Sequence, residues 1–270
     1  MRRYNFILGA MLALVISSQQ TLLADKDDDL IRCAKEGSQT FLFAHGLNGK
    51  PQEWDTFHDY IKEMHPTYGI WRTKVKGKGH IKERAHELAE FMQRAEKKCL
   101  PSKKSVVAVG HSMGGLDLRY IVGNKKTFED QLKLIDAVYT IATPHLGDPN
   151  ACAALKSGIH DLCGHPKNPD NDSPMKSFNK NYPASDFVDR KIHFRAFYYE
   201  CAAKEKGEDG VVLIESQKWE GHTKHSENRG NGYHKTKDCS KKDGCVPELC
   251  QEDEIKHILS LEIARNAKLK

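Results

Sequence analysis

The sequence lacks any long apolar run after residue 16, so no later segment is expected to cross a membrane. It contains no internal repeat, no low-complexity tract and no linker that would divide it. Basic residues exceed acidic ones by five, but no stripe of basic and aromatic side chains accompanies that excess, so a nucleic-acid partner is not expected. With 270 residues, 39% hydrophobic and 29% charged, the chain predicts one globular domain.

The first 24 residues are predicted to be an export signal. Arg2 and Arg3 give a positive start, and residues 6–16 form an apolar stretch that is short for a membrane span. Small and polar residues follow, with Ala24 as the best last residue before cleavage, and an uncleaved anchor is the alternative. We therefore expect a signal peptide over 1–24, a mature domain over 25–270, and a secreted or periplasmic protein.

An even number of cysteines in an exported chain indicates disulfide bonds. Cys152 and Cys163 would close one local loop, and a pair among the last three cysteines would close another. A zinc site with His234 is the competing interpretation, but no paired C-x-x-C supports it, and no metal is expected. The eight are Cys33, Cys99, Cys152, Cys163, Cys201, Cys239, Cys245 and Cys250.

Short apolar runs alternate with amphipathic segments along the chain. Strands are predicted over 39–44, 105–110, 135–143 and 192–199, and helices over 81–98, 116–122 and around 255–263. Residues 218–242 are polar and are predicted to form loops. Because the strands are apolar on both faces, the pattern predicts an α/β fold with a mostly parallel sheet covered by helices on both faces.

The main chemical motif is GHSMGG at residues 110–115, which follows a strand and precedes a helix. This is the context of a nucleophile elbow, in which a tight turn lifts Ser112 clear of the sheet at a helix N-terminus. Glycine at positions 110 and 114 would avoid collisions of side chains with neighbouring backbone. The alternative is a glycine-rich turn with an ordinary capping serine.

A second motif, His45-Gly46, ends an upstream strand. In acyl transfer, backbone amides must stabilise the oxyanion of the tetrahedral intermediate. One donor follows the nucleophile and another comes from a loop after an earlier strand, so the amides of Met113 and Leu47 are the predicted oxyanion hole. His45 itself is expected to be a packed loop histidine without acid–base chemistry.

Three collinear stretches resemble bacterial secreted lipases and esterases of the α/β-hydrolase superfamily. They read FAHGLNG at 43–49, GHSMGGL at 110–116 and TIATPHLG at 140–147, and the resemblance extends from about residue 39 to residue 215. It implies an α/β-hydrolase fold, a Ser–acid–His triad in that chain order, and an ester substrate.

The resemblance assigns the acid of the triad to Asp209, which comes after the strand at 192–199 and is followed by Gly210 and Val211. A turn aspartate is the alternative. The base is His234, in a loop before the last helix, while His222, His225 and His257 remain open as alternatives. The surroundings of His234 depart from the family, because they are rich in lysine and flanked by cysteines.

Residues 147–189 are rich in Asn, Pro, Asp, Ser and Lys and are predicted to be an irregular insertion. Many lipases carry a cap at this place, so we expect it to cover an acyl pocket. A surface excursion closed by Cys152 and Cys163 is equally consistent with its composition.

The sequence therefore predicts a secreted serine hydrolase that cleaves carboxylic esters, lipase-like, through an acyl-enzyme on Ser112. No cofactor is expected. The expected partners are a small-molecule or lipid ester and, transiently, a lipid interface, without an obligatory protein partner. A thioesterase of the palmitoyl-protein type, with Trp219 after the acid, and an inactive hydrolase-fold binding protein remain as alternatives.

Overall fold

The computed structural model describes residues 28–99, 106–154, 157–165, 172–199, 212, 214–218, 226–229, 232–233, 246–250 and 252–268. Their framework is a seven-stranded sheet in the order β1-β3-β2-β4-β5-β6-β7, parallel throughout except between β1 and β3. The strands are β1 (Ile31–Arg32), β2 (Thr40–Ala44), β3 (Gly69–Arg72), β4 (Val106–His111), β5 (Ile135–Ile141), β6 (His193–Tyr198) and β7 (Ser226–Asn228). This confirms the predicted fold class.

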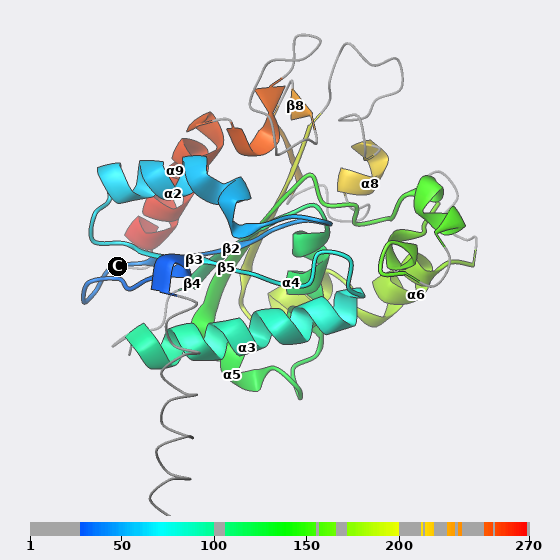
Figure 1. Cartoon of the computed structure of the whole chain (residues 1–270), viewed down its shortest axis with the longest axis horizontal. Coiled ribbons are helices and arrows are strands. Elements are labelled where there is room, and N and C mark those ends of the chain that lie inside the picture. Colours follow the sequence, from blue (N-terminus) through cyan, green and yellow to red (C-terminus); the bar gives the residue numbers. More distant parts are fainter. Residues whose placement is uncertain are drawn as a thin grey trace, which may run out of the picture.

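The central strands are buried on both faces because helices cover both sides of the sheet (Figure 1). On one side α3 (Ile81–Cys99), α4 (Met113–Gly123), α5 (Glu129–Leu134) and α7 (Ser185–Asp189) contribute to one large apolar cluster. On the other, α2 (Asp55–Met64) and α9 (Glu252–Lys268) pack together over a second cluster. A strand that is covered by helices on both faces needs apolar side chains on both, which explains the continuous apolar runs in the sequence.

The predicted helices at 81–98, 116–122 and 255–263 are confirmed by α3, α4 and α9, whereas α2, β1 and β3 were not predicted. The prediction of loops throughout 218–242 was wrong at Ser226–Asn228, which form β7. All three residues are polar, and they join the sheet through backbone pairing with β6 at its edge. A second, two-stranded sheet pairs β8 (Gly232–Tyr233) with β9 (Val246–Pro247).

The predicted insertion at 147–189 divides into two parts. Its first part contains the short 3-10 helices η3 (Pro149–Ala153) and η4 (His160–Leu162) and then α6 (Pro174–Asn181), beside the carboxyl end of the sheet. Its last part is α7, which packs against α4 and β6 and buries Phe187 in the core. Only the part before α7 therefore lies where a cap would lie.

Two disulfides join described cysteines. Cys152–Cys163 closes the local loop predicted from the sequence, and Cys33–Cys99, which was not predicted, ties the start of the domain to the end of α3. Cys250 is also disulfide-bonded, which contradicts the alternative of a zinc ligand at that position. Cys201, Cys239 and Cys245 lie outside the described residues, as does the predicted signal peptide. Within the described ranges, none of the helices has the length and apolarity that a bilayer span would need.

Candidate active site

Ser112 lies at a sharp bend between β4 and α4, where it is the N-cap residue of the helix. Its backbone has φ 51° and ψ −125°, in a region that non-glycine residues rarely adopt. Two hydrogen bonds hold the bend: the Ser112 amide donates to the Ile141 carbonyl at 2.9 Å, and the Gly115 amide donates to the Ser112 carbonyl at 3.1 Å. Backbone strain of this kind persists where the surrounding structure fixes it, and it is concentrated at functional sites.

Glycine is required on both sides of this bend. A Cβ atom on Gly110 would lie 2.7 Å from the Cα atom of Gly115, and one on Gly114 would lie 2.3 Å from the Ala44 carbonyl oxygen at the end of β2. Both distances are far inside van der Waals contact. The collisions predicted for side chains at positions 110 and 114 are therefore confirmed, and Gly114 in addition brings the start of α4 directly against the end of β2.

The loop after β2 approaches Ser112 equally closely. A Cβ atom on Gly46 would lie 2.9 Å from the Ser112 Cβ atom. The two predicted oxyanion donors are the amides of Leu47, which follows Gly46, and Met113, which follows Ser112. Neither amide donates a hydrogen bond within the described part of the chain. The amide next to Ser112 and the amide next to Gly46 are thus both without an acceptor among the described residues.

His45, at the start of this loop, is buried and structural. Burial lowers the pKa of its imidazole to about 4, so the ring is neutral at physiological pH. Its Nε2 atom accepts a hydrogen bond from the Val75 amide at 3.3 Å, and its Nδ1 atom lies 3.0 Å from the Gly46 carbonyl oxygen, to which it donates. Both ring nitrogens therefore contact backbone atoms, and the ring shapes the loop.

A buried ion pair that was not predicted links this loop to α4. Arg84 of α3 and Asp117 of α4 are both fully buried, and their closest N–O distance is 2.8 Å. The same guanidinium donates to the His45 carbonyl at 2.7 Å. Burial raises the pKa of Asp117 to about 6, against the opposite effect of Arg84, so the carboxylate is ionised at neutral pH. The pair fixes the loop relative to Ser112.

A second buried arginine, Arg119 of α4, holds the insertion. It donates to the Asn179 side chain at 2.9 Å and to the Tyr182 carbonyl at 2.7 Å, both at the end of α6, and to the His145 carbonyl at 3.3 Å. Burial lowers the pKa of His145 well below its usual value, so this ring too is neutral. Through Arg119, α4 is thereby held to the segment after β5 and to α6.

A pocket of about 310 Å³ opens beside Ser112. One side comes from the elbow and from the loop after β2, residues 45–50, which we call the oxyanion loop after its predicted donor Leu47. The other side comes from the insertion. The side chains that face it are mostly apolar, as is typical of small-molecule sites. Its lining consists of Gly46, Leu47, Glu53, His111, Ser112, Pro144, Asp148, Asn150, Ala151, Ile159, Leu162 and Val212.

The predicted acid Asp209 and base His234 lie outside the described residues, as do the alternative bases His222 and His225. The remaining alternative, His257, lies on α9, where its Nε2 atom is 3.0 Å from a carboxylate oxygen of Glu227 and its ring packs against Phe197. That side chain is therefore engaged away from the elbow, in the contact between α9 and β7.

Comparison with known proteins gives two sequence matches. The family model described as "Putative serine esterase (DUF676)" matches residues 34–159, which include β2, the oxyanion loop and the elbow. Triacylglycerol lipase 2 of Saccharomyces cerevisiae is 44% identical over 82 residues, which cover 29% of this chain and 24% of the yeast protein. The match thus spans about a quarter of that relative.

Solved structures show the same architecture. The mature form of the Bacillus licheniformis lipase BlEst2 is 19% identical over 74% of this chain and 86% of its own, with a TM-score of 0.51. The lin2722 product of Listeria innocua is 15% identical over 83% of this chain and 92% of its own, with a TM-score of 0.50. The chain has the α/β-hydrolase fold, and over residues 34–159 it is similar to serine esterases.

Proposed function

We propose that this protein is a serine hydrolase that cleaves carboxylic esters, with lipase-like acyl esters as substrates. One observation carries the proposal: a serine at a strained strand–helix bend lines a mostly apolar pocket next to two amides that donate no hydrogen bond within the described part of the chain. The match of residues 34–159 to a serine esterase family supports the same reaction.

In the proposed reaction, His234 removes the proton of the Ser112 hydroxyl, and the serine oxygen attacks the ester carbonyl. The amides of Leu47 and Met113 stabilise the oxyanion, and the alcohol leaves with a proton from the histidine. Water, deprotonated by the same histidine, then cleaves the acyl-enzyme. Asp209 holds the imidazole and stabilises its protonated form.

The order of the strands favours these partners. β4, β6 and β7 are parallel, so their carboxyl ends lie at the same edge of the sheet. Ser112 directly follows β4, and in the sequence Asp209 comes after β6 and His234 after β7. His222 and His225 come before β7, and so they would approach from the other end of that strand.

We further propose that the protein is exported and that residues 1–24 are removed. Disulfides are rare in reducing compartments, and the described part of the chain contains Cys33–Cys99 and Cys152–Cys163. The insertion before α7 would then act as a cap that selects acyl chains, because it supplies five of the residues that line the pocket: Asp148, Asn150, Ala151, Ile159 and Leu162.

The test is Ser112→Ala, assayed on p-nitrophenyl esters and thioesters of several chain lengths. We expect ester hydrolysis to fall by a factor on the order of 10⁴ or more, with an unchanged circular dichroism spectrum. Ser260→Ala, which removes an exposed serine of α9, is the matched control and should keep full activity. A fluorophosphonate probe should label the wild type and the control but not Ser112→Ala. Unchanged turnover in Ser112→Ala would remove this serine from the mechanism.

The base is tested in the same assay by His234→Ala, His222→Ala and His225→Ala. We expect only His234→Ala to approach the residual rate of Ser112→Ala. If a different histidine variant shows that loss, the histidine it replaces is the base, and Ser112 remains the proposed nucleophile.

A further inference from the structure

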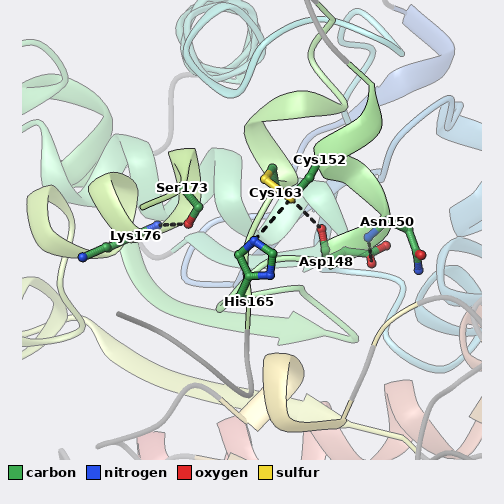
Figure 2. The surroundings of a disulfide bond; sticks show 7 residues. All are labelled: Asp148, Asn150, Cys152, Cys163, His165, Ser173 and Lys176. Atoms are coloured by element: carbon green, nitrogen blue, oxygen red, sulfur yellow. Dashed lines mark hydrogen bonds between the residues drawn. A yellow bond between two sulfur atoms is a disulfide. The ribbon is translucent and has the colours of Figure 1, made fainter. Parts of the chain in front are cut away.

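The Cys152–Cys163 disulfide joins the two segments that form the insertion side of the pocket (Figure 2). Asn150 and Ala151 precede the first cysteine, and Ile159 and Leu162 precede the second. Apart from the sulfurs, an isolated β-bridge between Asp148 and Cys163 joins the segments: the Asp148 amide donates to the Leu162 carbonyl at 2.7 Å, and the Gly164 amide donates to the Asp148 carbonyl at 3.4 Å. The covalent bond is therefore a major restraint on the shape of this wall.

An imidazole lies against one of the two sulfurs. The Nε2 atom of His165 is 3.9 Å from the Sγ atom of Cys152, whose other polar neighbour is the Asp148 carbonyl oxygen at 4.0 Å (Figure 2). Cys152 and His165 are half-buried, whereas Cys163 is buried, so a reagent from solvent reaches Cys152 first. A protonated imidazole at this position stabilises negative charge on sulfur and makes the thiolate a better leaving group.

The other described disulfide provides an internal comparison. Cys33 is exposed and Cys99 half-buried, so that bond is at least as accessible to solvent. No histidine in the described ranges contacts either of its sulfurs. Accessibility alone would favour reaction at Cys33–Cys99, while the imidazole favours reaction at Cys152–Cys163.

We propose that Cys152–Cys163 is a site of thiol–disulfide exchange with dithiol reductants, that His165 is its positioning residue, and that exchange loosens the pocket wall beside Ser112. The exchange chemistry is independent of the proposed hydrolase function, whereas its effect on hydrolysis rests on that function.

The reaction has two steps. A thiolate of the dithiol attacks the Sγ atom of Cys152, a bond forms between these sulfurs, and Cys163 leaves with the electron pair and takes a proton from solvent. The second thiolate of the reagent then attacks its own sulfur in the mixed disulfide, closing a cyclic disulfide and releasing Cys152 as a thiolate beside His165. The dithiol is oxidised by two electrons and the cysteine pair is reduced by two. Negative charge develops on the leaving Cys163 sulfur in the first step and on the Cys152 sulfur in the second, and a ring nitrogen of His165 lies within 4.8 Å of both sulfurs.

The exchange is tested by timed reduction of the folded protein with dithiothreitol, followed by alkylation and peptide mapping. We expect Cys152 and Cys163 to be alkylated before Cys33 and Cys99. His165→Gln should slow opening of Cys152–Cys163 by about three- to tenfold and leave Cys33–Cys99 unchanged. His160→Gln, which changes another half-buried histidine of the same wall, is the matched control and should have no effect. Equal opening rates of the two disulfides, or no effect of His165→Gln, would overturn the proposal.

The effect on the pocket is tested with the double variant Cys152→Ser, Cys163→Ser, matched by Cys33→Ser, Cys99→Ser. We expect the first pair to raise KM for a pocket-filling ester several-fold, with a smaller change in kcat, and the second pair to leave KM unchanged. Should the first pair fail to fold, wild-type protein selectively reduced and alkylated at Cys152 and Cys163 replaces it. Equal KM values in opened and intact protein contradict the effect on the pocket. A wild type that hydrolyses no ester overturns the proposed function and this effect together, and the alkylation rates still decide the exchange chemistry.

Discussion

The two sides of the pocket beside Ser112 are held in different ways. On the side of the sheet, the elbow and the oxyanion loop touch backbone to backbone, and the fully buried pair Arg84–Asp117 ties them together. On the side of the insertion, a disulfide and a few polar contacts hold two short 3-10 helices, and several of these contacts are half-exposed.

This difference suggests that the two sides of the pocket have different functions. Oxyanion stabilisation loses most of its value when a donor is displaced, so it requires the more rigid side. Selection among acyl chains depends on the shape of an apolar surface and tolerates a side that adjusts. The predictions below test whether the sheet side controls turnover and stability while the insertion side controls substrate binding.

The largest effect is expected from Asp117→Asn. The substitution leaves the Arg84 guanidinium buried without a countercharge, which should lower the free energy of unfolding by about 3–5 kcal/mol. Urea denaturation measures the loss. Asp130→Asn, which breaks the exposed contact with Lys133, should cost much less, because solvent screens that pair. Similar losses in both variants would mean that the buried pair does not hold the sheet side.

Gly46→Ala should affect turnover more than stability. The new methyl group would lie 2.9 Å from the Ser112 Cβ atom, so the loop must move away and carry the Leu47 amide with it. We expect kcat to fall by about 10²-fold, as when one oxyanion donor is removed. Steady-state kinetics on a soluble ester measures this, with Gly37→Ala as control because space around Gly37 is open, although its φ of +74° adds some strain. A change confined to KM would contradict the role of this loop.

Leu162→Ala should give the opposite kinetic pattern. Leu162 lines the pocket from the insertion, and its loss removes apolar contact with the acyl chain. We expect KM to rise by up to about tenfold for longer acyl chains while kcat changes little. A chain-length series of p-nitrophenyl esters measures it. If kcat fell as far as in Gly46→Ala, the two sides would not differ as proposed.

The smallest effect is expected from the contact between His80 and Asp161. One Asp161 oxygen lies 3.0 Å from the His80 Nδ1 atom, and the other accepts from the Ile81 amide at 2.8 Å, which ties η4 to the start of α3. The hydrogen bond to Asp161 raises the pKa of His80, followed in size by the charge of the same carboxylate.

Because the pKa of His80 is raised in the folded protein, its contact with Asp161 stabilises the fold fully at a pH below the unfolded pKa of about 6.5. This stabilisation is lost as the pH rises through the pKa of His80 in the folded state. His80→Gln should therefore lower Tm slightly at pH 5.5 and have no effect at pH 9. Thermal unfolding at both pH values measures this, and an equal loss at both would exclude the charged contact. His58→Gln is the control, because His58 contacts its sequence neighbour Asp59 and that contact joins no separate elements.

Local sequence patterns were sufficient for the features that depend on neighbours in the chain. The apolar run before Gly110 and the glycines around Ser112 predicted β4 and the bend, because strand burial and turn sterics are decided within a few residues. The loop closed by Cys152 and Cys163 was predicted for the same reason.

Features that depend on distant partners were missed. The burial of Arg84 was not predicted, because the partner that compensates its charge, Asp117, is 33 positions away in the sequence. The available signal was Asp117 itself, a carboxylate between two leucines in a helix with few polar residues. β7 was missed because an edge strand can pair through its backbone without apolar side chains.

The Cys33–Cys99 bond encloses β2, β3, α2 and all of α3 in one covalent ring, together with the oxyanion loop and Arg84. A single peptide-bond cleavage between residues 34 and 98 would therefore leave the two fragments linked, and they would separate on a denaturing gel only after reduction. A protease that nicks a surface turn in this half of the domain cannot by itself release the segment that carries the loop. For a protein exposed to other enzymes, this ring would keep a nicked molecule in one piece.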